Sequence, residues 1–364
     1  MKRKLFFSSA TVGLLIAVIA CDFSGERSKS VVRITAEQRA QIEQVGILHN
    51  EGLDFILADL MAEKIRLFKE SGGNPQTRSS SGGAFPETFD FEQFAISSTG
   101  RFMKTIAPEL DEDFLNVVLS STKTRSLTQS SAAERDAEVM EILTPFQQEY
   151  YNRIMAIMGR DGMTPVILRK ELAELEEEII REATTIEEAE HLLAAMSIAV
   201  HSAEYWTENL MKWNTVLNSR IVRAIDPSED LYQEIIQSVA TRSGPESNEN
   251  FFLVPHPYYK NWFIIIDLDN GTATLIECPA NLVFNPNLCA CDWPDPDEEE
   301  DQNSSGSSSN PSTADLWAAD VAGAIGGAAA GSMAGGVGAL PGAAGGGLVA
   351  SAVEGIIQIF KWIF

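Results

Sequence analysis

The sequence predicts a mainly α protein, in which a helical domain precedes a small β-hairpin, a disordered acidic linker and a C-terminal glycine-zipper helical hairpin. Apolar side chains alternate by three and four over residues 192–217, which is a helical heptad pattern. Over residues 262–276, β-branched and aromatic residues instead flank Asp269-Asn270-Gly271, a strong hairpin signal. From Val321 to Val353, 22 of 33 residues are Gly or Ala and none is charged.

The N-terminus has the features of an export signal over residues 1–20. Three basic residues, Lys2 to Lys4, precede an apolar run from Leu5 to Ala20. The following Val18-Ile19-Ala20-Cys21 resembles the lipobox of bacterial lipoproteins. That resemblance implies cleavage before Cys21, diacylation of its thiol, and a tether over 21–34. Ordinary cleavage and an uncleaved anchor are the alternatives.

The charge of the mature chain limits its partners. Removal of three basic residues leaves 24 Lys and Arg against 52 Asp and Glu, a formal charge of −28. Such a chain repels phosphate backbones, so we expect no nucleic-acid partner. Membrane contact would come from the acyl group and the apolar tail, two signals that together suffice for stable anchoring. We therefore expect an exported, membrane-anchored lipoprotein of the inner membrane, outer membrane or cell surface.

Lipidation of Cys21 leaves an odd number of cysteines. In an oxidising compartment we expect one disulfide, from Cys278 to either Cys289 or Cys291, and one free thiol.

The helical domain is expected over residues 35–245. Thr35 to Gln38 and Thr185 to Glu188 both have the spacing of a helix capping box. Gly46 and Gly52 are candidates for a break in the first helical stretch, and Pro145 is expected to end or kink a later one. The expected helices cover 35–70, 88–105, 109–121, 132–160, 168–179, 185–217 and 228–241. The hairpin and cysteine segment then covers 246–291, and the acidic, Ser-rich linker 292–314.

The tail, residues 315–364, has a four-residue period. Two registers of small residues recur along it: Gly323, Gly327, Gly331 and Gly335, then Gly338, Gly342, Gly346 and Ala350. In a helix this spacing exposes backbone on one face, which allows close helix packing. Helices over 321–339 and 342–360, joined at Pro341, would each be about 28 Å long. Their glycine content makes either helix too weak to insert alone, so we expect packing against a partner.

The tail also resembles the glycine-zipper tails of small bacteriocins and related membrane-perturbing peptides. That resemblance implies membrane contact, or self-assembly of the protein as a homo-oligomer through the tail. A flexible tail without a membrane role is the alternative. Because a low-complexity linker precedes it, we expect the folded core not to need the tail.

A second candidate site lies near the start of the helical domain. Four polar residues, His49, Asn50, Glu51 and Asp54, fall within six positions. The segment resembles a Gly-x-x-His-Asn-x-x-Leu-Asp element of uncharacterised bacterial exported proteins, some of which have bacteriocin-like tails. The similarity extends to a later Ser-x-x-Tyr-Trp element, here residues 202–206. The family has no activity to transfer, and a structural role for His49 and Asn50 is the alternative.

No other pattern indicates catalysis. Glu188 and His191 have the spacing of a di-iron ligand pair, but the nearest second pair, His201 and Glu204, is reversed. The glycine after Asp269-Asn270 is one position early for a calcium loop. We therefore predict no metal, no cofactor and no enzyme activity. The leading hypothesis is a non-catalytic envelope lipoprotein whose tail binds membrane or itself. The alternatives are a toxin-like protein whose tail permeabilises a membrane, and an exported enzyme without a recognisable site.

Overall fold

The computed structural model describes residues 32–70, 85–118 with gaps, 139–226 except Asp161, 251–292 with gaps, 313–333 and 339–363, and a few positions over 228–233. Several sequence predictions lie outside these residues. They are the signal peptide, Cys21, most of the tether and linker, and most of the helices expected over 109–121 and 228–241.

The protein is mainly α with a small antiparallel sheet, as predicted. It forms two compact units. Unit 1 draws on residues 1–56, 90–207 and 311–364, and unit 2 on residues 57–89 and 208–310. This division differs from the predicted domains in three ways. The glycine-rich tail belongs to unit 1, residues 57–89 join the β segment, and so do residues 208–245, which were expected to be helical but include β1.

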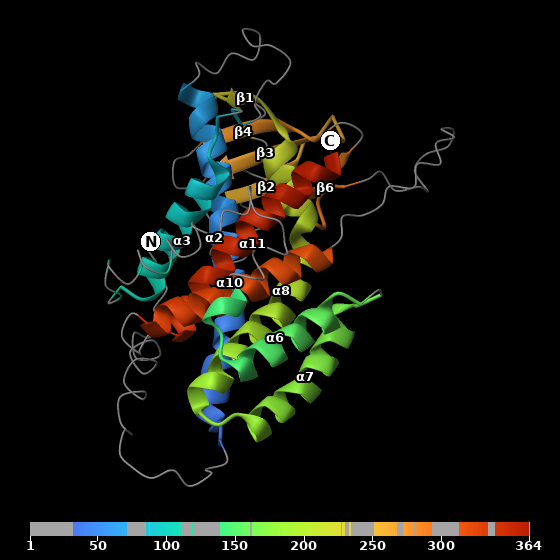
Figure 1. Ribbon diagram of the computed structural model, residues 1–364. Helices are drawn as coiled ribbons and strands as arrows, with labels where there is room; N and C mark the ends of the chain where they lie inside the picture. Colours follow the sequence, from blue (N-terminus) through green and yellow to red (C-terminus); the bar gives the residue numbers. More distant parts are fainter. Residues whose placement is uncertain are drawn as a thin grey trace. The chain divides into compact units, whose positions relative to one another are not determined.

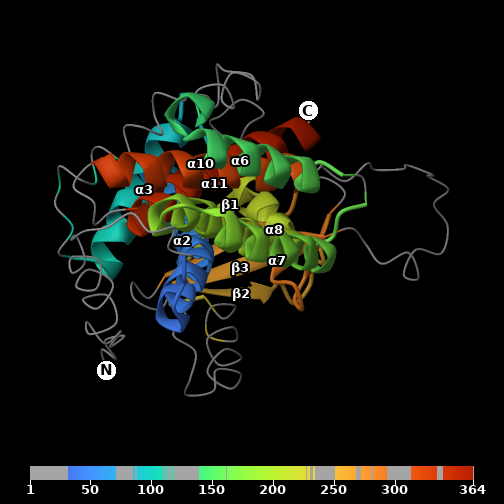
Figure 2. The ribbon, with the colours of Figure 1, turned by 60° about the horizontal axis from the view of Figure 1, so that its bottom comes forward.

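Unit 1 is built from helices (Figures 1 and 2). It contains α3 (Phe91–Ile106), α6 (Pro145–Met158), α7 (Pro165–Glu182), α10 (Thr313–Met333) and α11 (Ala339–Ile363), with the first part of α2 (Ala36–Glu70) and of α8 (Ile186–Asn218). Helix α10 packs on α11 and α6, α11 packs on α3, and α6 packs on α7.

Helix α2 is continuous, although its glycines suggested a break. Its start has the predicted capping box: the Thr35 amide donates to Gln38 Oε1 at 2.9 Å, and the Gln38 amide donates to Thr35 Oγ1 at 3.1 Å. Pro145 starts α6 at its first turn, after a short helical segment that ends at Ile142. The first turn of a helix leaves its amide N–H groups without an intrahelical partner. Proline has no N–H group, so it is favourable at this position.

The glycine-rich segment folds as two helices, but the turn is not at Pro341. Pro341 is the third residue of α11, where a proline is tolerated for the same reason as in α6. Helix α10 ends at Met333 and α11 begins at Ala339, two residues before Pro341. We refer to α10 and α11 together as the glycine hairpin.

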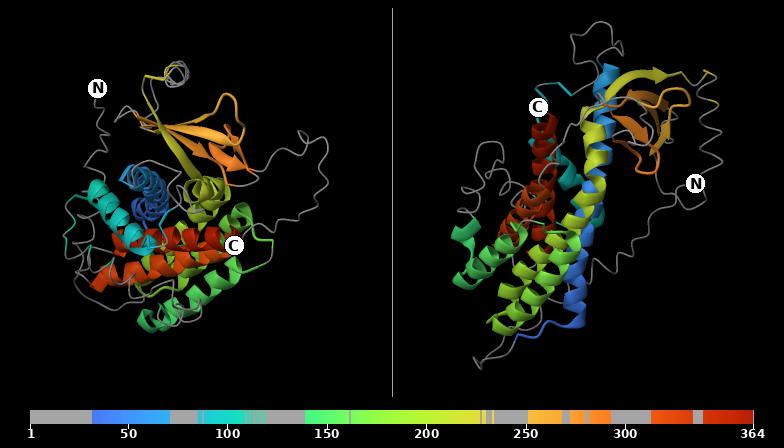
Figure 3. Two further views of the ribbon diagram at one scale, coloured as in Figure 1. Left: turned by 90° about the horizontal axis from the view of Figure 1, so that it is seen from above. Right: turned by 90° about the vertical axis from the view of Figure 1, so that its right-hand side faces the viewer.

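Unit 2 contains a four-stranded antiparallel sheet in the order β1-β4-β3-β2 (Figure 1), and Figure 3 shows the ribbon from two further sides. The strands are β1 (Arg220–Ile225), β2 (Phe251–Pro255), β3 (Trp262–Asp267) and β4 (Thr272–Glu277), followed by the paired β5 (Val283–Asn285) and β6 (Ala290–Asp292). The predicted hairpin is present as β3 and β4, paired from Trp262–Glu277 to Asp267–Thr272. The apolar core of the sheet is a cluster of buried side chains from β1, β3 and β4: Ile225, Ile264, Ile266, Ala273 and Leu275.

The ammonium group of a buried lysine caps the C-terminal end of α8 in unit 2. Lys64 Nζ donates to the main-chain oxygens of Val216 at 2.7 Å and Ser219 at 2.5 Å. Burial lowers the pKa of Lys64 to about 7. The carbonyl oxygens oppose this shift, because the negative end of a helix dipole favours a cation.

The disulfide joins Cys278 to Cys291, and Cys289 is free and exposed. The disulfide closes a loop between two cysteines that are 13 positions apart in the sequence. We expect Cys278→Ser to lower the unfolding free energy of unit 2 by about 2–3 kcal/mol, because the unfolded chain gains freedom. Urea denaturation measures this loss, and Cys289→Ser is the matched control. Equal stability of the two variants would rule out this role for the bridge.

Candidate functional site

The best candidate for a functional site is the surface of unit 1 that binds the glycine hairpin. We define this hairpin-binding surface as residues 46–56 of α2, helix α3 and residues 197–206 of α8. Among the residues that the structure describes, no group of three or more His, Cys, Asp or Glu side chains is arranged to hold a metal ion.

Within the hairpin, the two helices contact each other through glycine. A Cβ atom at Gly323 would lie 2.6 Å from the carbonyl oxygen of Gly346, and a Cβ at Gly327 would overlap the carbonyl oxygen of Gly342. The two predicted glycine registers therefore face each other within one chain. Gly331 lies in α10, but its surroundings are not among those described, and Gly335 and Gly338 fall outside the described residues.

Glycines also create the fit between the hairpin and its binding surface. A Cβ at Gly52 would overlap the side chain of Leu348 in α11. In the opposite direction, a Cβ at Gly355 of α11 would overlap the indole ring of Trp206 in α8. Each side thus supplies one large side chain and one glycine gap that receives the partner's side chain.

Gly46 has a related role between α2 and α8. A Cβ atom there would lie 2.7 Å from the Ser197 hydroxyl oxygen and would overlap the ring of His201. The glycines that lower the helix propensity of α2 are therefore positions of close helix contact, which explains why the helix is unbroken.

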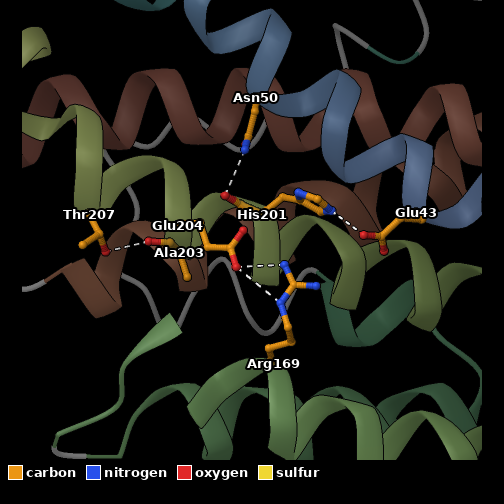
Figure 4. A network of polar contacts seen from close by, with 7 residues as sticks. All are labelled: Glu43, Asn50, Arg169, His201, Ala203, Glu204 and Thr207. Carbon is orange, nitrogen blue, oxygen red and sulfur yellow. Dashed lines mark hydrogen bonds and ion pairs between the residues drawn. The ribbon is translucent and has the colours of Figure 1, made fainter. Parts of the chain in front are cut away.

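The two sequence elements singled out above meet in the structure, although about 150 positions separate them (Figure 4). Asn50 Nδ2 donates to the main-chain oxygen of His201 at 3.0 Å, and the Tyr205 hydroxyl donates to Asp54 Oδ1 at 3.0 Å. Beside them, His201 Nε2 lies 2.8 Å from Glu43 Oε1. Burial and the nearby charge of Asp54 raise the pKa of Glu51. These contacts hold α2 against α8.

His49 is fully buried on this surface. Its Nδ1 lies 3.2 Å from Asn50 Oδ1, and burial lowers its pKa to about 4, against a smaller opposing effect of the Asn50 contact. The imidazole is therefore neutral at neutral pH. The main chain of Gly347 in α11 also acts on this ring, so His49 belongs to the hairpin contact.

A buried polar cluster joins the hairpin to α8. Ser202 Oγ donates to Asp320 Oδ2, and Trp206 Nε1 donates to Ser351 Oγ at 3.0 Å. Burial, together with the nearby Glu354, raises the pKa of Asp320 well above its ordinary value, although the Ser202 hydroxyl opposes this shift.

The sequence reasoning missed this cluster. A signal was present, because Asp320 and Glu354 are the carboxylates that border the uncharged stretch of the tail on each side.

His191 has a structural role at another contact with the hairpin. Its Nδ1 lies 3.1 Å from Gln147 Nε2, and its Nε2 lies 2.9 Å from Ser332 Oγ of α10. Glu188, the other member of the di-iron spacing, accepts a bond from the Thr184 hydroxyl at 2.6 Å. Neither side chain is part of a metal-binding group among the described residues.

Several buried polar atoms of unit 1 have no hydrogen-bond partner within the described part of the chain. They are His49 Nε2, Thr99 Oγ1, Trp317 Nε1 and Asp320 Oδ1. All four belong to the glycine hairpin or its binding surface. An unsatisfied buried polar group costs about 1–3 kcal/mol. The interface therefore combines close apolar packing with buried polar side chains.

We expect Asp320→Asn to stabilise unit 1 more at high pH than at low pH. Because the folded-state pKa is raised, the folded protein keeps a proton that the unfolded chain loses above about pH 4. The contribution of Asp320 is therefore most favourable below that pH and is lost as the pH rises through the folded-state pKa. Asparagine does not titrate, so the stability gain over the parent should grow with pH in urea denaturation. A gain that does not change with pH would refute the assignment.

Comparison with known proteins identifies no relatives: no protein-family model, curated protein or solved structure matches the chain significantly. Length and composition single out one stretch among the described helices, Leu340–Ile359 of α11, that could cross a membrane. Most of that stretch is buried inside unit 1. Core helices of soluble proteins also meet this criterion, so the stretch alone does not establish a membrane protein.

Proposed function

We propose that the protein is a non-catalytic, lipid-anchored envelope protein that stores a membrane-binding glycine hairpin in its helical unit. The observation that carries this proposal is the packing of α11. Its Leu340–Ile359 stretch is apolar enough to span a bilayer, and it is covered by helices that leave glycine-sized gaps for it. A membrane-binding segment stored in this way would not aggregate before it reaches a membrane.

The composition of the interface supports release of the glycine hairpin from its binding surface. Buried polar side chains of the interface, such as His49 and Asp320, regain hydration when the hairpin leaves its binding surface. The hairpin would leave as a pair, because Gly323 and Gly327 already pack on α11. This arrangement favours membrane contact over self-assembly through the zipper, since self-assembly would first have to separate the two helices.

A toxin-like function is the second candidate. The same storage would protect the producing cell from a hairpin that permeabilises membranes. An exported enzyme is the third candidate, and none of the contacts described above favours it.

The storage proposal is tested by weakening the binding surface without changing the hairpin. In Gly52→Leu, the new side chain would compete with Leu348 for the same space. We expect this variant to bind phosphatidylcholine vesicles more strongly than the parent. The matched control is Leu172→Ala, which destabilises unit 1 at a buried leucine of α7. Equal vesicle binding by both variants would argue against storage, and dye release from the vesicles would favour the toxin-like candidate.

The anchor is tested separately. Cys21→Ser should abolish metabolic labelling by an alkyne fatty acid and release the protein from the lipid anchor. Labelling that persists in this variant would exclude Cys21 as the lipid-bearing residue.

A further inference from the structure

The loop between β2 and β3 in unit 2 is a rigid, exposed aromatic segment. The amides of Tyr258 and Tyr259 donate to His256 Nδ1 at 3.1 and 3.3 Å. The His256 amide donates to the main-chain oxygen of Trp262 at 3.0 Å, and the Trp262 amide donates to that of Tyr259 at 3.1 Å. The loop therefore has a fixed conformation before it meets any partner.

Neighbouring parts of unit 2 hold the base of this loop. The Cys278 amide donates to the main-chain oxygen of Asn261 at 2.8 Å, and the Phe284 amide donates to that of Lys260 at 2.8 Å. The disulfide of Cys278 restrains the same region.

The rings of the loop contact one another yet remain open to solvent. The ring centroids of Tyr259 and Trp262 are 4.8 Å apart, and those of His256 and Tyr259 are 5.1 Å apart. Tyr258 is nevertheless 75% exposed and Tyr259 is 54% exposed. Rigid aromatic side chains lose little conformational entropy on binding, so exposed ones are typical of interaction surfaces.

The charge around the loop differs from that of the whole chain. From Asn250 to Ile266 there is no acidic residue, and Lys260 is the only Lys or Arg, in a chain with a net charge of −25. Burial lowers the pKa of His256, and Arg223 of β1, which is itself paired with Glu229, adds to this shift. Glu277, which pairs with Trp262 across the sheet, has a long contact of 3.9 Å with Arg220. The stretch from Asn250 to Ile266 itself therefore carries no negative charge, in a strongly acidic protein.

We propose that Tyr258 and Tyr259 form a second membrane contact, which enters the headgroup region of a lipid bilayer. Tyrosine suits this position because its ring is apolar and its hydroxyl stays hydrated. The absence of acidic residues from this stretch lets the loop approach a bilayer that the rest of the chain would avoid. The inference rests on the proposed membrane anchoring, since a tethered protein meets the bilayer repeatedly.

The test uses the mature chain, residues 21–364, with Cys21→Ser, so that neither the apolar leader nor an acyl group contributes, and flotation with phosphatidylcholine vesicles. We expect Tyr258→Ser/Tyr259→Ser to lower the partition coefficient roughly tenfold, which corresponds to about 1.4 kcal/mol. Tyr258→Phe/Tyr259→Phe should retain binding. The control Val166→Ser/Ile167→Ser removes another exposed apolar pair, 80% and 43% exposed, and should have no effect.

Two results would overturn the proposal: unchanged binding of the tyrosine-to-serine variant, or an equal loss in the control. Unchanged vesicle binding together with loss of a protein partner would assign the loop to protein recognition instead. The vesicle-binding results for the tyrosine variant and for Gly52→Leu together distinguish the membrane loop from hairpin storage. If Gly52→Leu has no effect while the tyrosine variant loses binding, the storage proposal fails and the membrane loop stands.

Discussion

Gly327→Ala should lower the unfolding free energy of unit 1 by more than about 2 kcal/mol, although alanine is the better helix former. The reason is steric. The added Cβ would overlap the carbonyl oxygen of Gly342 and lie 2.9 Å from the Cα of Gly346, and neither backbone atom can rotate away. The two helices of the hairpin would have to separate, which would disturb their contacts with α3 and α8. Urea denaturation followed by circular dichroism measures the loss.

Gly345→Ala is the matched control for this prediction. It is also a glycine-to-alanine change in the hairpin, but its Cβ would lie 3.4 Å from Val118 Cγ1. That distance leaves room for a small shift, so the gain in helix propensity should prevail, by up to about 1 kcal/mol. The two substitutions should therefore have opposite signs. Changes of the same sign and size would show that the glycines provide only flexibility.

Deletion of residues 311–364 should unfold unit 1. The deletion would expose the buried side chains of Ile198, Ser202 and Trp206, together with the rest of the hairpin-binding surface. Truncating a single buried large side chain costs about 2–5 kcal/mol, and a domain is stable by only about 5–15 kcal/mol. The loss of a whole hairpin therefore exceeds what unit 1 can tolerate, so release of the hairpin into a membrane would unfold unit 1 as well.

Circular dichroism and limited proteolysis measure this effect. We expect a large loss of helical signal and of cooperative unfolding, and rapid cleavage within α3, α6 and α7. The sheet of unit 2 contains no hairpin residue, so protection of Phe263 to Ile266 by the sheet should persist. A truncated protein that melts cooperatively with a helix-dominated spectrum would contradict the structure and restore the sequence-based expectation of an independent core.

Much of the fold could be predicted from local patterns. Heptad spacing, capping boxes and the Asp269-Asn270-Gly271 turn correctly predicted α8, the start of α2 and the pairing of β3 with β4. The strands β1, β2, β5 and β6 were missed, because β1 directly follows a long helix and the other three are only three to five residues long. Such short segments carry little periodicity of their own.

The position of the tail could not be predicted from the sequence. Its Gly and Ala composition predicts a helix that packs closely, but composition does not say against which surface. The acidic linker before it suggested a separate segment, whereas the complementary gaps at Gly52 and Gly355 become visible only when the helices are placed together. The contacts of Asn50 with His201 and of Tyr205 with Asp54 likewise join distant positions, which spacing along one chain does not reveal.

Hydrogen exchange of the full-length protein without lipid tests the stored hairpin most directly. The account predicts that the amides of Ala343 to Ile359 in α11 exchange as slowly as those of Leu192 to Trp206 in α8, because both segments are buried in unit 1. Addition of phosphatidylcholine vesicles to Gly52→Leu should then loosen the binding surface while α11 remains protected by lipid. If α11 exchanges like an unprotected chain while α8 stays protected, the hairpin is not stored in unit 1.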